Sequence, residues 1–168
     1  MEKELNLDIA KRLNELFLLS GYKVIMTRDE DISTDESIKF NKRKDIRNRI
    51  ELINKQKNAL LLSIHMNKFP QGQYAGSQMF YSVKEPKSRI LAEVLQDFIK
   101  VNLQQNNDRQ AKPIPSSVFL FKNVNITTVL AECGFLSNNN ELILLKTDEY
   151  RQKLALCLYL GVIKYIIL

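Results

Sequence analysis

Two short strand-forming runs constrain the fold of this chain more than any other feature of its sequence. Residues 59–65 read Ala-Leu-Leu-Leu-Ser-Ile-His, and residues 127–133 read Thr-Thr-Val-Leu-Ala-Glu-Cys. The first run is continuous and apolar, which is typical of a β-strand buried on both faces, and the second reads as a strong β-strand. With the helical patterns that alternate with them, the two runs predict a layered α/β domain.

Helical patterns and further strands surround these two runs. The first helix has an apolar stripe from Leu5 to Phe17 and ends before Gly21, since a helix commonly terminates on glycine. Other helices are predicted at residues 44–54, at residues 90–103 and from Asp148, the expected N-cap of the last helix. Other strands are predicted at residues 22–27, 77–82 and 118–121. This alternation predicts an α/β fold with a mostly parallel or mixed central sheet flanked by helices.

The length of the chain fits a single domain, which we place at residues 1–168. With 168 residues, of which 45% are hydrophobic, the chain can bury one core and is short for two. Its first residues include Glu2 and Glu4 instead of a basic segment, so we expect no signal peptide. The apolar run at residues 154–168 is shorter than a membrane span and contains Lys164, so we expect no transmembrane segment.

The chain is basic, with a net charge of +6, which favours polyanionic partners such as nucleic acid, an anionic membrane or an anionic cell wall. One local cluster consists of Lys39, Lys42, Arg43, Lys44, Arg47 and Arg49. Clusters of this kind are more often a solvated helix face than a binding patch. Because the sequence has neither a Gly-rich phosphate loop nor an aromatic-basic RNA motif, nucleic acid is not an expected partner.

Three chemistry-bearing side chains are expected at one edge of the predicted sheet. His65 ends the first of the two predicted strands, and Glu132 nearly ends the second. Sites in open α/β sheets form at the carboxyl ends of strands, and Glu2, just before the first helix, faces the same edge. One histidine with carboxylates on a rigid edge suits metal-assisted hydrolysis, in which zinc activates water and a carboxylate takes its proton. His65 fits a zinc ligand, while Glu2 or Glu132 fits either ligand or base.

Each of these residues also has an ordinary structural explanation. A single histidine at the end of a strand is more often solvated than bound to a metal. Glu132 could begin a surface loop, although its apolar neighbours favour partial burial and a need for a partner. Glu2 is a favourable acid at the N-terminus of a helix. Spacing alone therefore leaves an α/β domain with a candidate metal site.

Five motifs add a resemblance to a known family. They are Glu2–Leu7, Thr27–Asp29, the pair Arg49 and Asn54, Ser63–Asn67 and Leu130–Asn138. In this order, and over essentially the whole chain, they resemble the motifs of the zinc-dependent N-acetylmuramoyl-L-alanine amidases of the Amidase_3 type. The motifs around His65 and Glu132 are the most specific.

The resemblance implies a peptidoglycan hydrolase that cleaves the amide between N-acetylmuramic acid and L-alanine. It implies that Glu132 is the catalytic acid and base and that Glu2 and His65 are zinc ligands. Arg109 and Lys112 lie in a polar loop where basic residues could meet substrate carboxylates, although a solvated loop is an equal interpretation. The resemblance further implies action outside the cytoplasm, at the cell wall or spore envelope.

Within the family, the chain is most similar to the germination-specific amidases of the spore cortex. This similarity lies in the long polar segment at residues 28–43, in residues 51–54 and in residues 74–81. Those enzymes act with a deacetylase to make muramic lactam in the cortex. An activating protein partner is also consistent with this placement.

One departure from the family motif concerns the metal. The family begins with a strand and a turn, Asp-Pro-Gly-His-Gly-Gly, whose histidine is the first zinc ligand, whereas His65 is the only histidine in this sequence. We therefore expect an N-terminally truncated member that lacks the first strand of the family fold and keeps two zinc ligands. The alternative function is a catalytically impaired domain that binds the wall or a partner, and a weaker one is a basic nucleic-acid binder.

Overall fold

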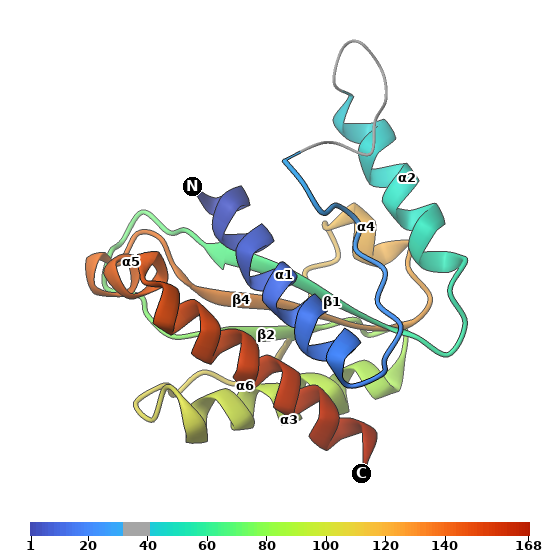
Figure 1. Cartoon of the computed structure of the whole chain (residues 1–168). Coiled ribbons are helices and arrows are strands. Elements are labelled where there is room, and N and C mark those ends of the chain that lie inside the picture. Colours follow the sequence, from blue (N-terminus) through green and yellow to red (C-terminus); the bar gives the residue numbers. More distant parts are fainter. Residues whose placement is uncertain (32–40) are drawn as a thin grey trace.

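The structure is a computed structural model that describes residues 1–31 and 41–168 (Figure 1). The helices are α1 (Glu2–Leu19), α2 (Lys42–Asn54), α3 (Pro86–Asn102), α4 (Phe119–Lys122), α5 (Asn139–Lys146) and α6 (Asp148–Ile166). The strands are β1 (Leu60–Asn67), β2 (Gln78–Tyr81), β3 (Lys112–Pro113) and β4 (Thr127–Phe135). Part of the polar loop predicted between residues 28 and 42, including Lys39, lies outside the described residues.

The four strands form one mixed sheet in the order β1-β4-β2-β3. β1 and β4 run parallel, β2 is antiparallel to β4, and the short β3 is parallel to β2. The predicted α/β class with a mixed sheet flanked by helices is confirmed. Within the described ranges, no helix combines the length and apolar character that a membrane span requires.

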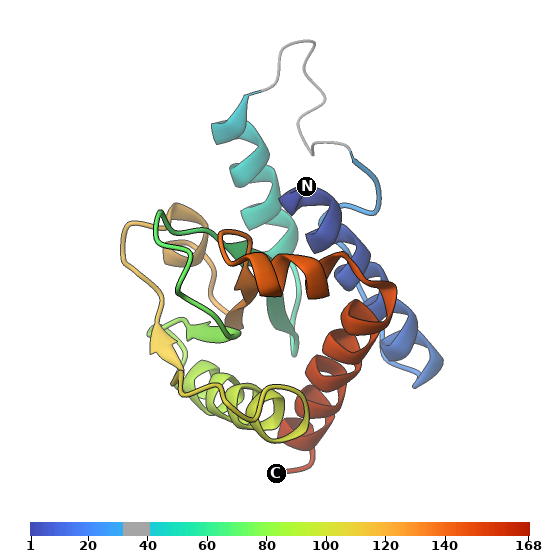
Figure 2. The ribbon, with the colours of Figure 1, turned by 90° about the vertical axis from the view of Figure 1, so that its left-hand side faces the viewer.

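Helices α1, α3 and α6 cover one face of the sheet and form the core with it (Figures 1 and 2). Alternate residues of β4, namely Val129, Ala131 and Cys133, belong to this core and are fully buried. Since side chains alternate along a strand, Thr128, Leu130 and Glu132 are directed to the other face. The strand that builds the core therefore also presents Glu132 on the side away from these three helices.

Three predicted elements differ from the structure. Residues 22–27 form no strand, because the described residues provide them with no hydrogen-bonded neighbour in the sheet. β1 is an edge strand, and most of its residues are half-exposed, so burial of this run on both faces was a wrong prediction. The strand predicted at residues 118–121 is the start of α4, whose Phe121 is buried.

The C-terminus of α1 agrees with the prediction from the sequence, whereas the N-cap of α6 differs from it. Gly21 follows α1 with a φ of 82°, a conformation that glycine adopts without strain. The N-cap of α6 is Thr147, whose side chain accepts a hydrogen bond from the backbone N–H of Tyr150. Asp148 is instead the first residue of the helix, where its charge favours the N-terminus.

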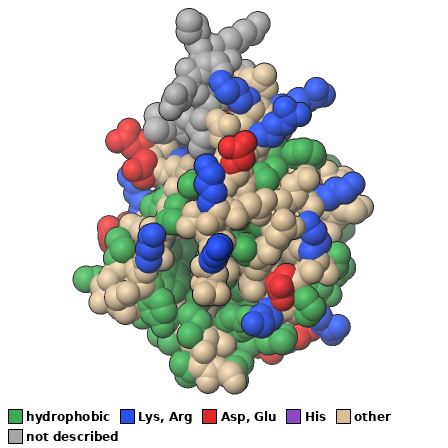
Figure 3. Space-filling view, turned by 90° about the vertical axis from the view of Figure 1, so that its right-hand side faces the viewer, with side chains coloured by type: hydrophobic (Ala, Val, Ile, Leu, Met, Phe, Trp, Pro, Cys, Tyr) green, Lys and Arg blue, Asp and Glu red, His purple; other side chains and the backbone are tan. Residues whose placement is uncertain are grey.

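The basic cluster divides into exposed and structural members. The α2 residues Lys42, Arg43, Lys44 and Arg47 are exposed. Figure 3 shows Lys and Arg side chains spread over the face of the molecule that carries this helix. Arg49 is instead half-buried, with its Nε 2.9 Å from Asp45 and its Nη1 3.0 Å from the Thr27 hydroxyl. Arg49 therefore ties α2 to the segment that follows α1.

We expect Gln96→Leu to destabilise the fold by roughly 1–3 kcal/mol, because the buried N–H of Met79 would lose its partner, while the Ser77 carbonyl would keep a hydrogen bond from Asn107. The Gln96 side chain is 2% exposed, accepts from the N–H of Met79 at 2.9 Å and donates to the carbonyl of Ser77 at 3.1 Å. Urea unfolding checks this value, with the exposed Gln105→Leu as the matched control. Equal unfolding midpoints for the two variants would contradict the expectation.

Candidate active site

The sheet register brings three polar side chains into one row at the edge predicted from the sequence. In the parallel pair, His65 of β1 lies opposite Glu132 of β4. In the antiparallel pair, Gln78 of β2 lies opposite Glu132 on its other side. Residues that lie opposite one another in neighbouring strands share a face of the sheet. The row His65, Glu132 and Gln78 is therefore set by backbone pairing.

Helix α1 adds Glu2 to the end of this row. The Oε1 atom of Glu2 lies 3.4 Å from the Nδ1 atom of His65, and the two side chains are 45% and 46% exposed. The structure thus brings together Glu2 and His65, which are far apart in the sequence. An imidazole nitrogen and a carboxylate oxygen at this separation face the same small volume.

The position of α1 is fixed by ion pairs with α6. Asp8 accepts from Arg12 at 2.9 Å within α1 and from Arg151 of α6 at 2.5 Å. Arg12 also pairs with Asp148 at the start of α6. Because α1 and α6 share buried apolar residues as well, the N-terminus of α1 is held against the edge of the sheet.

Glu132 has the electrostatic character of a general base. Its Oε2 atom is buried and has no hydrogen-bond partner among the described residues. Burial, together with the negative charge of Glu2, raises the pKa of Glu132 from its ordinary value of 4.5 to about 7. A carboxylate with a pKa near neutrality can both accept and return a proton under physiological conditions.

In the metal-free protein, Glu132→Gln should raise the free energy of unfolding at pH 8 by roughly 2–3 kcal/mol. The folded protein holds the Glu132 proton at pH values where the unfolded chain has lost it, so stability falls as pH rises from 4.5 to about 7. The gain should disappear at pH 4, where both states are protonated. Thermal unfolding with a chelator at both pH values checks this, and the exposed Glu51→Gln is the control. An equal gain at pH 4 would contradict the expectation.

Glu2 and His65 could fill two of the three protein-ligand positions that a catalytic zinc requires. Such a zinc is held by three protein ligands and keeps one position for water, and histidine nitrogen and carboxylate oxygen are both suitable donors. Glu2 and His65 supply one of each. Within residues 1–31 and 41–168, no group of three or more His, Cys, Asp and Glu side chains is placed to hold a metal. A complete set needs one more donor than this pair provides.

The two basic residues predicted to meet substrate occupy different places. Arg109 donates from Nη1 to the side chain of Gln78 at 3.0 Å and from Nε to the carbonyl of Ala75 at 2.7 Å. It therefore extends the row beyond Gln78. Lys112 is exposed on β3 opposite Phe80, two positions along β2 from the row. The structure brings Arg109 to the candidate site, whereas it leaves Lys112 further away.

Two residues that the sequence analysis missed support the site. Gln78 is 4% exposed. It lies opposite Glu132 in the sheet and accepts a hydrogen bond from Arg109. Glu141 of α5 accepts from the N–H of Gly76 at 2.9 Å and from the N–H of Phe135 at 2.8 Å. A polar residue inside an apolar strand was the available signal for Gln78. Nothing in the local sequence of Glu141 distinguishes it from a solvated acid of a first helical turn.

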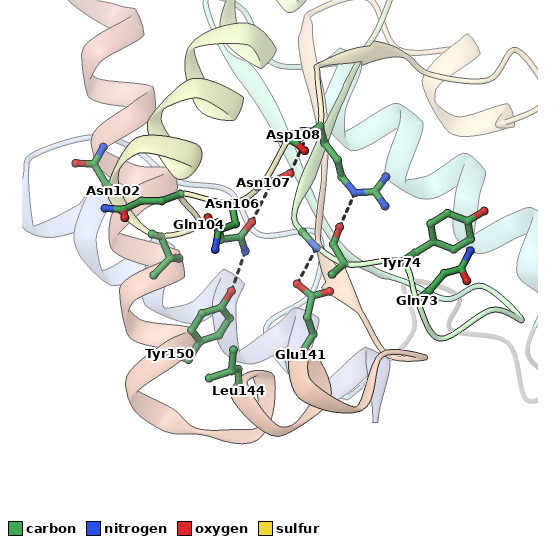
Figure 4. A pocket seen from close by; sticks show the side chains of 15 residues that line it. Gln73, Tyr74, Asn102, Gln104, Asn106, Asn107, Asp108, Glu141, Leu144 and Tyr150 are labelled. Carbon is green, nitrogen blue, oxygen red and sulfur yellow. Dashed lines mark hydrogen bonds between the residues drawn. The ribbon is translucent and has the colours of Figure 1, made fainter.

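A polar pocket of about 780 Å³ lies beside the row, on the side of Arg109 (Figure 4). Its lining includes Tyr74, Gln104 and Tyr150, and Gln104 donates to the Tyr150 hydroxyl at 2.8 Å. Glu2, His65 and Glu132 are not among the residues that line it. The pocket is therefore a neighbouring space that a large substrate could reach, and the reactive groups lie outside it.

A mixed α/β sheet whose carboxyl edge combines an imidazole with a perturbed carboxylate has the side chains of a candidate hydrolytic site. Comparison with known families makes this specific, since the model of the N-acetylmuramoyl-L-alanine amidases (Amidase_3) matches residues 1–164. The chain belongs to this family.

Individual relatives support the assignment. The germination-specific N-acetylmuramoyl-L-alanine amidase of Bacillus subtilis is 36% identical, over 98% of this chain and 70% of that protein. The amidase LytC of the same species is 31% identical, but this chain covers only 31% of its length. The CwlD amidase of Clostridioides difficile, solved in complex with the GerS lipoprotein, is 37% identical with a TM-score of 0.92. That match covers 99% of this chain and 86% of the CwlD chain.

Proposed function

We propose that this chain hydrolyses the amide that joins the lactyl group of N-acetylmuramic acid to L-alanine in peptidoglycan. The observation that carries the proposal is the Glu132 carboxylate in register with His65, whose buried Oε2 atom has no hydrogen-bond partner among the described residues, in a chain of the amidase family. A raised pKa prepares Glu132 for proton transfer in both directions. The match over 98% of this chain and 70% of a germination-specific amidase favours the same reaction.

In the proposed mechanism, Glu132 takes a proton from the attacking water as the water oxygen bonds to the amide carbon. The carbon–nitrogen bond then breaks, and Glu132 returns the proton to the leaving amine of L-alanine, so that the residue is regenerated. Zinc held by Glu2 and His65 would supply Lewis-acid polarisation of the carbonyl and a more acidic water. Half-exposure of Glu2 and His65 leaves these donors accessible from solvent.

We assign substrate positioning to Arg109 and, at a greater distance, to Lys112. The Arg109 guanidinium is held by Gln78 and Ala75 and is thus oriented before substrate arrives. Guanidinium groups bind carboxylates with fixed geometry. Carboxylates of the stem peptide are the groups that these two cations would meet.

The biological setting that we propose is the spore cortex, outside the cytoplasm. It is supported by the identity of 36% to the Bacillus subtilis germination-specific amidase and of 37% to the CwlD amidase. Because the CwlD amidase was solved with the GerS lipoprotein, we also propose that this chain uses an activating protein partner.

Cleavage of purified cortex peptidoglycan tests the proposed reaction. The chain is incubated with zinc and with the substrate, and new L-alanine amino groups and peptide-free glycan are measured. We expect both products in equal amounts. Release of sugars without free L-alanine amino groups would exclude the proposed bond.

A second candidate function is a wall-binding domain without catalysis. It is favoured by one observation, namely that the described residues place only Glu2 and His65 together as zinc donors. Co-sedimentation with peptidoglycan separates the two functions. Binding without any product in the presence of zinc would favour the second candidate.

A further inference from the structure

Two exposed aromatic rings lie together next to the row of His65, Glu132 and Gln78. Phe69 is 48% exposed and Tyr74 is 39% exposed, and their ring centroids are 5.4 Å apart. Both rings rest on the buried ring of Phe135, at 6.0 and 6.1 Å. We call Phe69, Tyr74 and Phe135 the aromatic shelf.

The aromatic shelf is continuous with the candidate active site. Phe135 is the last residue of β4, three positions after Glu132, and Phe69 follows the end of β1, four positions after His65. Arg109 lies over the Phe135 ring, with its Cζ atom 4.6 Å from the ring centroid. The shelf therefore begins where the row ends.

The loops that carry the shelf are anchored to each other. The N–H of Phe69 donates to the Ser137 hydroxyl at 3.2 Å, and the Asn138 side chain donates to the carbonyl of Gly72 at 2.9 Å. A Cβ at Gly72 would lie 2.9 Å from the Ser137 carbonyl oxygen, so the two segments are in close contact there. The two exposed rings are thus presented on a supported surface.

The polar environment of the shelf is supplied by Arg109. Its Nε and Nη1 atoms are bonded to Ala75 and Gln78, and no acceptor for Nη2 is found among the described residues. The Phe69 and Tyr74 rings are inclined by 60° to each other, so each presents its own ring face. An exposed ring face with a charged donor nearby matches the face of a pyranose ring. The C–H groups of a pyranose cover an aromatic ring while its hydroxyl and N-acetyl oxygens accept hydrogen bonds at the rim.

We propose that the aromatic shelf is a sugar-binding subsite for the glycan strand of the substrate. This inference rests on the proposed function, because it locates the glycan relative to Glu132. A sugar ring on Phe69 and Tyr74 would place the lactyl amide of a neighbouring residue toward the row. Binding of this part of the substrate would orient the amide and would not take part in the proton transfers.

Titration of the wild-type chain with tetra-N-acetylchitotetraose tests the shelf. This oligosaccharide has no peptide, so the proposed reaction cannot consume it. We expect Tyr74→Ala to weaken binding by about 3- to 10-fold and Tyr74→Phe to bind as the wild type does, because the ring face supplies the contact. The matched control is Tyr22→Ala, since Tyr22 is also 39% exposed and also packs edge-on against a phenylalanine, Phe17.

Several results would overturn the proposal. They are absence of saturable binding by the wild type, equal binding by Tyr22→Ala and Tyr74→Ala, or an effect of Tyr74→Ala on binding of a free stem peptide instead of the oligosaccharide. On peptidoglycan, Tyr74→Ala should lower kcat/KM by about the same 3- to 10-fold. If the chain binds the oligosaccharide through Tyr74 but releases no L-alanine amino groups, the shelf stands and the proposed amidase reaction fails.

Discussion

Replacement of Glu132 by glutamine should lower kcat for release of L-alanine amino groups by about 10²- to 10⁴-fold, the usual contribution of a positioned acid and base. The amide of glutamine keeps the volume of the side chain but can neither take the proton of water nor return one to the leaving amine. Binding of peptidoglycan should persist, because the aromatic shelf and Arg109 are unchanged. Steady-state rates on purified peptidoglycan with zinc measure the effect.

The same substitution provides its own control for folding. Since Glu132→Gln should stabilise the metal-free protein at pH 8, we expect the variant to be folded when its rate is measured. Glu51→Gln, on the exposed face of α2, should keep the wild-type rate. If Glu132→Gln kept the wild-type rate, Glu132 could not be the general base.

Replacement of His65 by alanine should abolish retention of zinc. We expect the wild-type chain to retain zinc after loading and dialysis. The variant should retain none, because it keeps Glu2 as the one remaining donor of the pair Glu2 and His65. Loss of an outer-shell partner of a metal ligand already costs 10- to 100-fold in affinity, so loss of a ligand should exceed that. Elemental analysis of dialysed protein gives the ratio of zinc to chain.

A neighbouring acid serves as the control for this experiment. Glu4 is in the same helical turn as Glu2, but its carboxylate pairs with the N-terminal amine at 2.7 Å. Glu4→Gln should therefore keep the wild-type zinc content. If neither the wild type nor Glu4→Gln retains zinc, Glu2 and His65 are insufficient as a ligand set, and the wall-binding function gains support.

The central sheet and the site edge could be predicted because they follow from two strongly patterned strands. The runs ending at His65 and Glu132 are the parallel neighbours β1 and β4, and their carboxyl ends meet at one edge. The proximity of Glu2 to His65 follows from the same rule, since α1 begins at that edge. These contacts depend on periodicity and strand topology, and both can be inferred from a single sequence.

The remaining features depend on contacts that no local pattern encodes. Residues 22–27 have strand-forming side chains, but a strand also requires a hydrogen-bonded neighbour, and none is present in the described part of the sheet. Residues 119–122 form a helical turn because Phe121 is buried there, against their β propensity. The roles of Gln78 and Glu141 in the site depend on contacts with residues that are distant in the sequence, so the local sequence does not predict them.

The pairing of β1 with β4 has a consequence for the order of events in folding. The register joins residue 60 to residue 127, so every residue between them is looped out while the ladder closes. Parallel pairings of such high contact order form slowly, whereas α1 and α6 can form from local contacts. His65 and Glu132 meet only when that ladder closes, so helical structure should precede the active arrangement, and catalytic competence should be among the last properties that a refolding chain acquires.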